Sequence, residues 1–312
     1  MLKRAELILT CCVLLSTSPG SSQRKGQVST NPLVGVIDFH CHTGPDVSGR
    51  SMSDFELVRL AKKDGMRGIV LKNHYFMTAG RAQIAMQEIG GIEVFGGIVL
   101  NRSAGGINAE AVRRMAQFEG HRGKVVWLPT VDAANSFEHG PGPRSVVAVV
   151  KDGQPVPELA EIFQIIAQNN LVFETGHSTP EESLILIPAA KAAGVKNIVV
   201  THAMLLGATP GQLKQMAAMG AVIEFCFQPA GLPNKKEPGI PAAIVSYAQA
   251  IKALGAEHVI IDSDLGQKGK PLHPDGLRTF IAELKASGLT DHEIDLMARI
   301  NPARLLGLDP LK

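Results

Sequence analysis

Apolar runs of strand length recur along the chain, and helical patterns lie between most of them. The runs are VGVIDFH (34–40), RGIVLKNH (67–74), IEVFGGIVL (92–100), KVVWLPTV (124–131), LVFETGH (171–177), NIVVTHA (197–203), AVIEFCF (221–227) and HVIIDSD (258–264). Such near-continuous apolar runs are typical of strands buried on both faces of a parallel sheet. Eight of them alternating with helices predict an α/β fold, the (β/α)8 TIM barrel, and a doubly wound open sheet is the alternative.

Helix start signals support this alternation. Ser53 with Glu56 predicts a capping box before FELVRLAKK, and Thr290 with Glu293 predicts one before the last helix. Two further boxes carry a proline at the first helical position, where proline is favoured. They are Thr179, Pro180 and Glu182, and Thr209, Pro210 and Gln212.

One segment, residues 134–158, departs from the alternation of strands and helices. It follows the fourth apolar run, and Asp152-Gly153 between two short β-prone runs predicts a hairpin. In a barrel, a segment after a strand extends from the carboxyl end, where such barrels carry their sites. The hairpin insertion is therefore a candidate cover for the pocket.

The first residues have the pattern of an export signal. Lys3 and Arg4 precede a short apolar run that ends in small residues, as in secretory signal peptides. The run is too short to remain as a membrane span. We predict a signal peptide at 1–22, a linker at 23–32 and the barrel at 33–312. The protein is then exported, to the periplasm or the medium, with no membrane contact after cleavage, and cytoplasmic otherwise.

Composition narrows the class of partner. The chain has 312 residues, 45% of them hydrophobic, and its 31 basic residues nearly balance 29 acidic ones. It lacks the basic footprint of a nucleic-acid binder, and 4% aromatic residues leave little stacking surface. Cys41 and Cys226 alone would survive signal cleavage, in strands not predicted to be neighbours, so no disulfide is expected. A small-molecule substrate fits this profile, and homo-oligomerisation is left open.

Polar side chains gather at the carboxyl ends of the predicted strands. Alternation places His40 and His42 on one face and turns Cys41 towards the helices. The others are Lys72 and His74 on the second strand, Glu174 and His177 on the fifth, His202 on the sixth, and Asp262 and Asp264 on the eighth. Imidazole with a carboxylate suits zinc, manganese, iron or nickel. The sequence therefore predicts a divalent metal site, with zinc as the first choice.

These positions resemble the amidohydrolase superfamily of metal-dependent hydrolases. The resemblance rests on HxH, GHSTPEE, VVTHA, the aspartate after strand eight and the closing NPARLLGL, and it covers essentially the whole predicted barrel. KNHYFMT with SDLGQ resembles an uncharacterised amidohydrolase-related family. The resemblance implies that His40 and His42 bind one metal, and that His177 and His202 bind a second or assist the first. It also implies that Asp264 binds metal and accepts a proton from water.

The fourth strand departs from the superfamily pattern. Binuclear members of the superfamily often carry a carboxylated lysine or a glutamate there, where this chain has VVWLPTVDA. Lys72 is therefore a candidate bridging carbamate, and the alternative is an ordinary cation that binds a substrate carboxylate or phosphate. One or two ions are expected accordingly.

The expected reaction is hydrolysis of an amide, lactam, lactone or ester bond by a metal-activated water. Asp264 and His202 are the candidate catalytic residues, with Asp262 as the alternative to Asp264. Further candidates that bind substrate or support the site are His74, Glu174 and Glu224. Arg50, Arg81 and Arg102 follow strand ends and are candidates for an anionic substrate, whereas His273 and the other histidines are expected at the surface or in loops.

Two alternatives belong to other functional classes. A phosphoesterase of the polymerase and histidinol phosphatase type would match DxHxH at Asp38, His40 and His42, but the later DxH motif of that family is missing from DSDLGQ. An exported barrel that binds a solute without catalysis is the other, and it predicts no tightly held metal.

Overall fold

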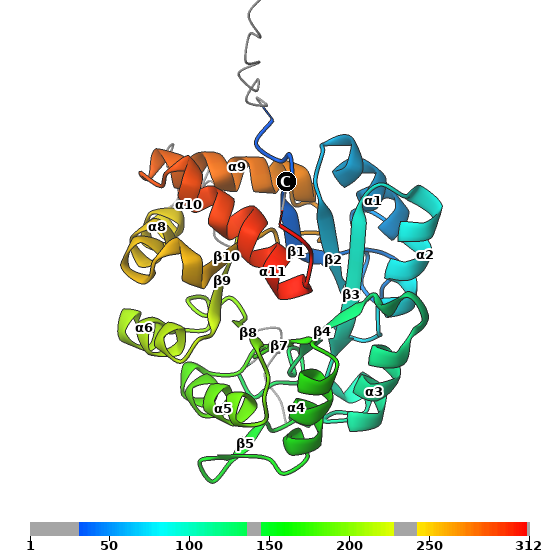
Figure 1. Ribbon diagram of the computed structural model, residues 1–312, viewed down its shortest axis with the longest axis vertical. Helices are drawn as coiled ribbons and strands as arrows, with labels where there is room; N and C mark the ends of the chain where they lie inside the picture. Colours follow the sequence, from blue (N-terminus) through cyan, green and yellow to red (C-terminus); the bar gives the residue numbers. More distant parts are fainter. Residues whose placement is uncertain (1–30, 136–144, 228–241, 311–312) are drawn as a thin grey trace, which may run out of the picture. The chain divides into compact units, whose positions relative to one another are not determined.

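The computed structural model describes residues 31–135, 145–227 and 242–310. Eight parallel strands form one sheet, paired in the order β1-β2-β3-β4-β7-β8-β9-β10 (Figure 1). They are β1 (Ile37–His42), β2 (Gly68–Lys72), β3 (Glu93–Val99), β4 (Gly123–Trp127), β7 (Val172–Glu174), β8 (Asn197–Val200), β9 (Val222–Cys226) and β10 (Val259–Asp262). The predicted (β/α)8 TIM barrel is confirmed.

The sheet closes where β1 meets the chain that follows β10. The backbone N–H of His42 donates to the carbonyl of Leu265 at 2.9 Å, and the N–H of Asp264 donates to the carbonyl of His40 at 3.0 Å. Cys41 and Leu265 form a parallel bridge between them. Closure therefore brings the end of the first strand beside the residues that follow the last strand.

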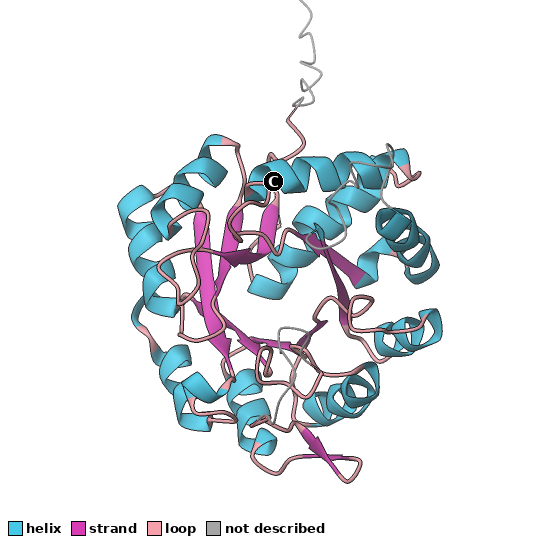
Figure 2. Cartoon of the chain, turned by 180° about the vertical axis from the view of Figure 1, so that it is seen from behind, coloured by secondary structure: helices cyan, strands magenta, loops and turns pink. Residues whose placement is uncertain are grey.

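Helices surround the ring of strands (Figure 2). They are α1 (Asp54–Lys63), α2 (Ala79–Ile89), α3 (Ala109–Gln117), α4 (Leu159–Gln168), α5 (Pro180–Ala192), α6 (Pro210–Ala218), α8 (Ala242–Leu254), α9 (His273–Ala286), α10 (Asp291–Asp295) and α11 (Asn301–Leu306). Short 3-10 turns are η1 (Arg102–Ala104), η2 (Glu119–His121) and η3 (Ala256–His258), and η4 (Leu296–Ile300) is a π-helix. The four predicted capping boxes, before α1, α5, α6 and α10, are all formed.

Two apolar clusters stabilise the barrel. The outer cluster joins strand residues such as Leu71 to helix residues such as Leu57. The inner cluster fills the barrel with Phe39 and Trp127 and includes Leu305 of α11. Because α11 packs against β1 and β10 in front of the ring in Figure 1, it fills the amino end of the barrel and leaves the carboxyl end for a site.

The segment between β4 and α4 contains a small antiparallel pair. Its strands are β5 (Val150–Lys151) and β6 (Gln154–Pro155), and Asp152 and Gly153 connect them with φ of 50° and 73°. The pair contacts α5, and none of the described insertion lines the pocket described below. The expected cover over the pocket is therefore not formed by these residues, and residues 136–144 of the insertion lie outside the described part.

The predicted signal peptide, residues 1–22, lies outside the described residues, as does most of the linker at 23–32. Export therefore stays a prediction from the sequence. Within the described ranges, no helix has both the length and the apolar character needed to cross a bilayer.

Candidate metal centre

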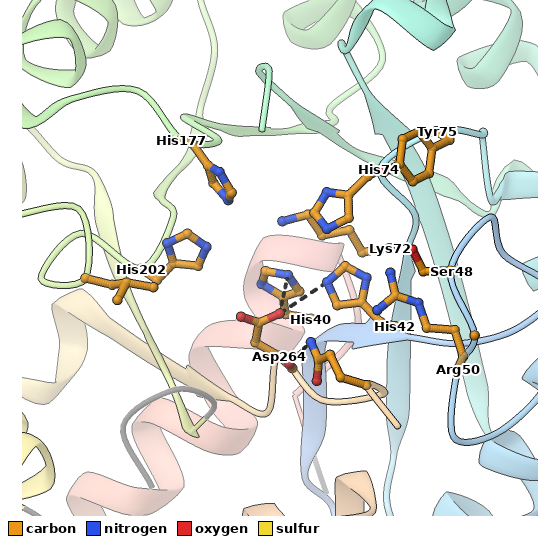
Figure 3. Close-up of a pocket in the computed structure, with 13 residues that line it drawn as sticks. His40, His42, Ser48, Arg50, Lys72, His74, Tyr75, His177, His202 and Asp264 are labelled. Carbon is orange, nitrogen blue, oxygen red and sulfur yellow. Dashed lines mark hydrogen bonds and ion pairs between the residues drawn. The ribbon is translucent and has the colours of Figure 1, made fainter. Parts of the chain in front are cut away.

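A pocket with a cavity volume of about 520 Å³ opens at the carboxyl ends of the barrel strands. Most of its polar lining side chains belong to the set predicted from the sequence. They include His40, His42, Lys72, His74, His177, His202 and Asp264. Figure 3 shows them converging on one space from different strand ends. The five histidines are buried, so water screens their interactions only weakly.

Strand β1 carries one extra residue, which aims both of its histidines into the pocket. Against β2, Asp38 pairs with Ile69 but Cys41 pairs with Leu71, so three steps on β1 match two on β2. Such a bulge shifts the alternation of side chains by one residue. Phe39 therefore packs inside the barrel while Cys41, a free thiol, packs in the outer cluster. Regular alternation, assumed from the sequence, is correct only for the last three residues of the strand.

Asp264 lies between the two histidines of β1. Its Oδ1 is 3.2 Å from Nε2 of His40 and 3.2 Å from Nε2 of His42. Nε2 of His40 nevertheless has no hydrogen-bond partner within the described residues, so the short contact is not a satisfied hydrogen bond. Ligand atoms at tetrahedral positions ~2.0–2.1 Å from zinc lie ~3.4 Å apart. Both distances to Oδ1 are close to this value, and all three atoms lie within 4.8 Å of one another, which fits a divalent metal ion.

The backbone at two site residues is held in an uncommon conformation. Asp264 has φ of 48° and His202 has φ of 23°, and neither is a glycine. Positive φ is strained for such residues and persists where surrounding structure holds it, often at functional sites. The hydrogen bond from Asp264 N–H to β1 holds the first of them.

His177 and His202 stand across the pocket from His42. The ring centroids of His177 and His202 are 5.0 Å apart, and those of His40 and His202 are 5.9 Å apart. His74 lies between His42 and His177, and its ring centroid is 4.8 Å from that of His42 and 6.4 Å from that of His177. Neither His177 nor His202 joins the group of ligand atoms within 4.8 Å of one another that the described residues form with Asp264. The closest ligand set that lines the pocket is therefore His40, His42 and Asp264. A second group within the same distance contains His40, Glu224, Cys226 and Asp262, of which only His40 lines the pocket.

Burial lowers the pKa of four of the pocket imidazoles, which favours their neutral form. It is the main cause that lowers the pKa of His42, His74 and His177, and nearby imidazoles and Lys72 lower it further. Burial also lowers the pKa of His202 to about 4, although the negative charges of Glu224 and Asp264 oppose the shift. Neutral imidazole is the form that binds a metal ion.

A buried carboxylate supports His40 from beneath. Nδ1 of His40 lies 3.2 Å from Oε1 of Glu224, and the backbone N–H of His202 donates to Oε2 at 2.9 Å. Burial favours the neutral acid, but His40 and His202 outweigh it and lower the pKa of Glu224. Glu224 does not line the pocket, so the structure places this predicted substrate contact below the site, where it orients His40.

Three other predicted placements differ in the structure. Glu174 is fully buried, accepts a hydrogen bond from the hydroxyl of Thr201 at 2.8 Å and does not line the pocket. Asp262 is also fully buried, and burial together with Glu224 raises its pKa, so Asp264 is the aspartate of the pocket. His273, expected at the surface, is buried with Nε2 3.1 Å from the carbonyl of His42, a contact for which the sequence carries no signal.

Two cationic side chains line the same pocket. Lys72 is 1% exposed, and its Nζ lies 5.3 Å from the ring centroid of Trp127. Nε of Arg50 donates to Oδ2 of Asp46 at 2.6 Å. Of the other candidate arginines, Arg81 is bound to Asp54 and Arg102 is exposed, and neither lines the pocket.

A family model described as "Family of unknown function (DUF6282)" matches residues 35–224. No curated protein matches the sequence significantly.

Solved structures of amidohydrolase type share the fold. A probable 2-pyrone-4,6-dicarboxylic acid hydrolase from Acinetobacter baumannii is 14% identical, with a TM-score of 0.59 over 88% of this chain and 100% of that chain. Organophosphorus hydrolase from Deinococcus radiodurans is 16% identical, with a TM-score of 0.56 over 89% and 94%. An amidohydrolase from Pseudomonas aeruginosa is 11% identical, with a TM-score of 0.62 over 88% and 96%. The amidohydrolase resemblance is thus confirmed at the level of the fold.

Proposed function

We propose that this chain, which belongs to the DUF6282 family of unknown function, is a metal-dependent hydrolase that cleaves an amide, lactam, lactone or ester bond of a small molecule. The observation that carries the proposal is the convergence of His40, His42 and Asp264 at the open end of the barrel. Three ligand atoms with zinc-like spacing, in a pocket of substrate size, leave room for water and a scissile bond.

The metal is proposed to be zinc, because two imidazoles and one carboxylate are a common zinc donor set, with manganese, iron and nickel compatible with it. When bound, such an ion lowers the pKa of a water molecule towards neutrality and polarises the carbonyl of the substrate. His40 and His42 would hold the ion through their imidazoles, and Asp264 would hold it through its carboxylate.

Asp264 has a second task in the reaction. The water oxygen attacks the carbonyl carbon, and Asp264 accepts a proton from that water. The carbon–nitrogen or carbon–oxygen bond then breaks, and Asp264 returns the proton to the leaving atom. His202 is neutral and stands across the pocket, so its ring is placed to orient the substrate carbonyl.

Two further observations support this reaction class. The similar solved structures carry hydrolase names, among them a weak promiscuous lactonase template. Asp38, which would complete a phosphoesterase DxHxH motif, is fully buried and does not line the pocket. Its Oδ1 instead accepts the backbone N–H of Ser263 at 2.9 Å and ties β1 to the chain after β10.

The test combines metal analysis with a substrate panel. Protein supplied with zinc or manganese should hold at least one ion per chain by elemental analysis. It should hydrolyse members of a panel of lactones, esters and amides, lose this activity with a chelator and regain it with metal. Substoichiometric metal with no turnover would favour a solute-binding barrel. Phosphate release from simple phosphate monoesters, with no lactone or amide cleavage, would favour a phosphoesterase.

Glu224→Gln is expected to lower zinc affinity by about 10–100-fold, because a carboxylate behind a ligating histidine fixes its tautomer and raises its basicity. Competition against a chromogenic chelator measures the change. Glu174→Gln is the matched control, since Glu174 is equally buried but bonds to Thr201 instead of a ligand. Equal zinc affinities in both variants would contradict the positioning role of Glu224.

A further inference from the structure

The pocket is chemically asymmetric. Figure 3 shows His177 and His202 on one side, Ser48 and Arg50 on the other, and Asp264, His40 and His42 between them. A substrate whose reacting bond lies over Asp264 therefore extends towards either the two histidines or Arg50. The side with Arg50 carries positive charge and, among the described residues, free hydrogen-bond donors, and these features indicate which direction the substrate takes.

The side chain of Arg50 is held in the pocket wall, and its terminal nitrogens form no hydrogen bond among the described residues. Its side chain is 8% exposed, and the described residues accept a hydrogen bond only from its Nε, at Asp46. Its backbone is fixed as well, since Arg50 bridges Gln267 and the N–H of Ser51 donates to Gly266 at 2.8 Å. The two terminal nitrogens of a guanidinium form a fork that matches a carboxylate. Because the Arg50 guanidinium is fixed in place and its terminal nitrogens are available, it can bind a carboxylate with little loss of side-chain entropy.

Lys72 forms no ion pair among the described residues, although the buried carboxyl groups of Glu174 and Glu224 interact with its charge at longer range. It pairs with His42 in the sheet, is 1% exposed, and its Nζ has no hydrogen-bond partner among the described residues. Its nearest aromatic partner is Trp127, and the face of a ring favours a cation over an anion. The contact therefore favours the ammonium form of Lys72 over a bridging carbamate. A buried ammonium without a hydrogen-bond acceptor is costly, and an anionic ligand in the pocket would supply the missing acceptor.

We propose that the substrate carries a carboxylate away from its scissile bond, and that the guanidinium of Arg50 binds it while Lys72 supplies the attracting charge. The inference rests on the proposed hydrolase function for the position of the reacting bond. A carboxylate fits better than a phosphate dianion, because Asp46 already offsets Arg50. The buried Glu174 and Glu224 also interact with Lys72, which leaves too little positive charge for a dianion.

Calorimetry on metal-free protein tests this subsite without any turnover. The probes are glutarate, its neutral analogue glutaramide and inorganic phosphate. Glutarate is expected to bind, more weakly as salt is raised to ~0.15 M, while glutaramide does not. Arg50→Gln and Lys72→Met should each weaken glutarate binding at least ~10-fold, the loss of one charged contact. Arg102→Gln, which changes an exposed arginine outside the pocket, should leave it unchanged.

Several outcomes would overturn the subsite. Glutarate binding that is equal in wild type and Arg50→Gln, with both folded by circular dichroism, removes Arg50 from it. Tighter binding of phosphate than of glutarate reassigns the ligand class, and density for a carboxylated Nζ at high resolution removes the charge of Lys72. Because no metal is present, these outcomes are separate from a failure of hydrolysis, which concerns the metal centre.

Discussion

Asp264→Asn is expected to lower kcat/KM by about 10²–10⁴-fold, the usual contribution of a positioned proton acceptor. The amide keeps one oxygen near the position of Oδ1 but cannot take a proton from water. Asparagine also tolerates positive φ better than most residues, so the backbone at 264, with φ of 48°, is compatible with the change. Activity should therefore be lost while much of the metal is retained, as measured by kinetics and elemental analysis on the same sample.

Asp262→Asn is the matched comparison. Asp262 lies two residues earlier, is fully buried and does not line the pocket, so its substitution should reduce activity far less. Full activity in Asp264→Asn together with a large loss in Asp262→Asn would move the role of base to Asp262.

His40→Ala and His42→Ala are both expected to lower zinc affinity by more than ~100-fold, since removing a ligand should exceed the effect of removing its support. They should differ in stability. His40→Ala leaves the buried carboxylate of Glu224 without its imidazole hydrogen bond, and losing the partner of a buried acceptor costs about 1–3 kcal/mol. His42 has no hydrogen bond at Nδ1 within the described residues, so His42→Ala should largely avoid this cost.

Metal titration and chemical denaturation of the metal-free proteins separate the two effects. His74→Ala is the control, because His74 lines the same pocket and stacks on His42 but lies outside the closest ligand set. If His74→Ala loses as much zinc affinity as His42→Ala, the proposed ligand set of His40, His42 and Asp264 is wrong. Equal unfolding free energies for His40→Ala and His42→Ala would contradict the role of Glu224.

Most of the fold was predictable because its signals are local. A strand buried on both faces needs an apolar run, and a helix start needs a side chain that accepts the free N–H groups, so each is written in consecutive residues. The box at Ser53 and Glu56 is an example, and the structure forms it as predicted. Eight such units with right-handed connections fit a barrel and an open doubly wound sheet alike, so the pairing of β1 with the chain after β10 is decided only in the tertiary structure.

The site was predictable only in part. His40, His42 and Asp264 were found because parallel strands of a barrel end at one face, which turns sequence position into proximity. Glu224 and His273 were misplaced because their roles depend on contacts with one particular residue on another strand, the imidazole of His40 and the carbonyl of His42. Such contacts depend on the rotation and depth of each side chain, which local patterns do not record.

By itself the sequence determined the alternation of strands and helices, the helix caps and the end of the barrel at which the polar residues meet. Only the tertiary structure decided which of those residues are in contact. The bulge between Asp38 and Cys41 lets Phe39 and His40 both face the inside of the barrel, and the closure of β10 on β1 carries Asp264 to within 3.2 Å of both histidines. The physical reason is that a register shift or a strand pairing is chosen by packing over the whole barrel, whereas a cap or an apolar run is chosen by its immediate neighbours.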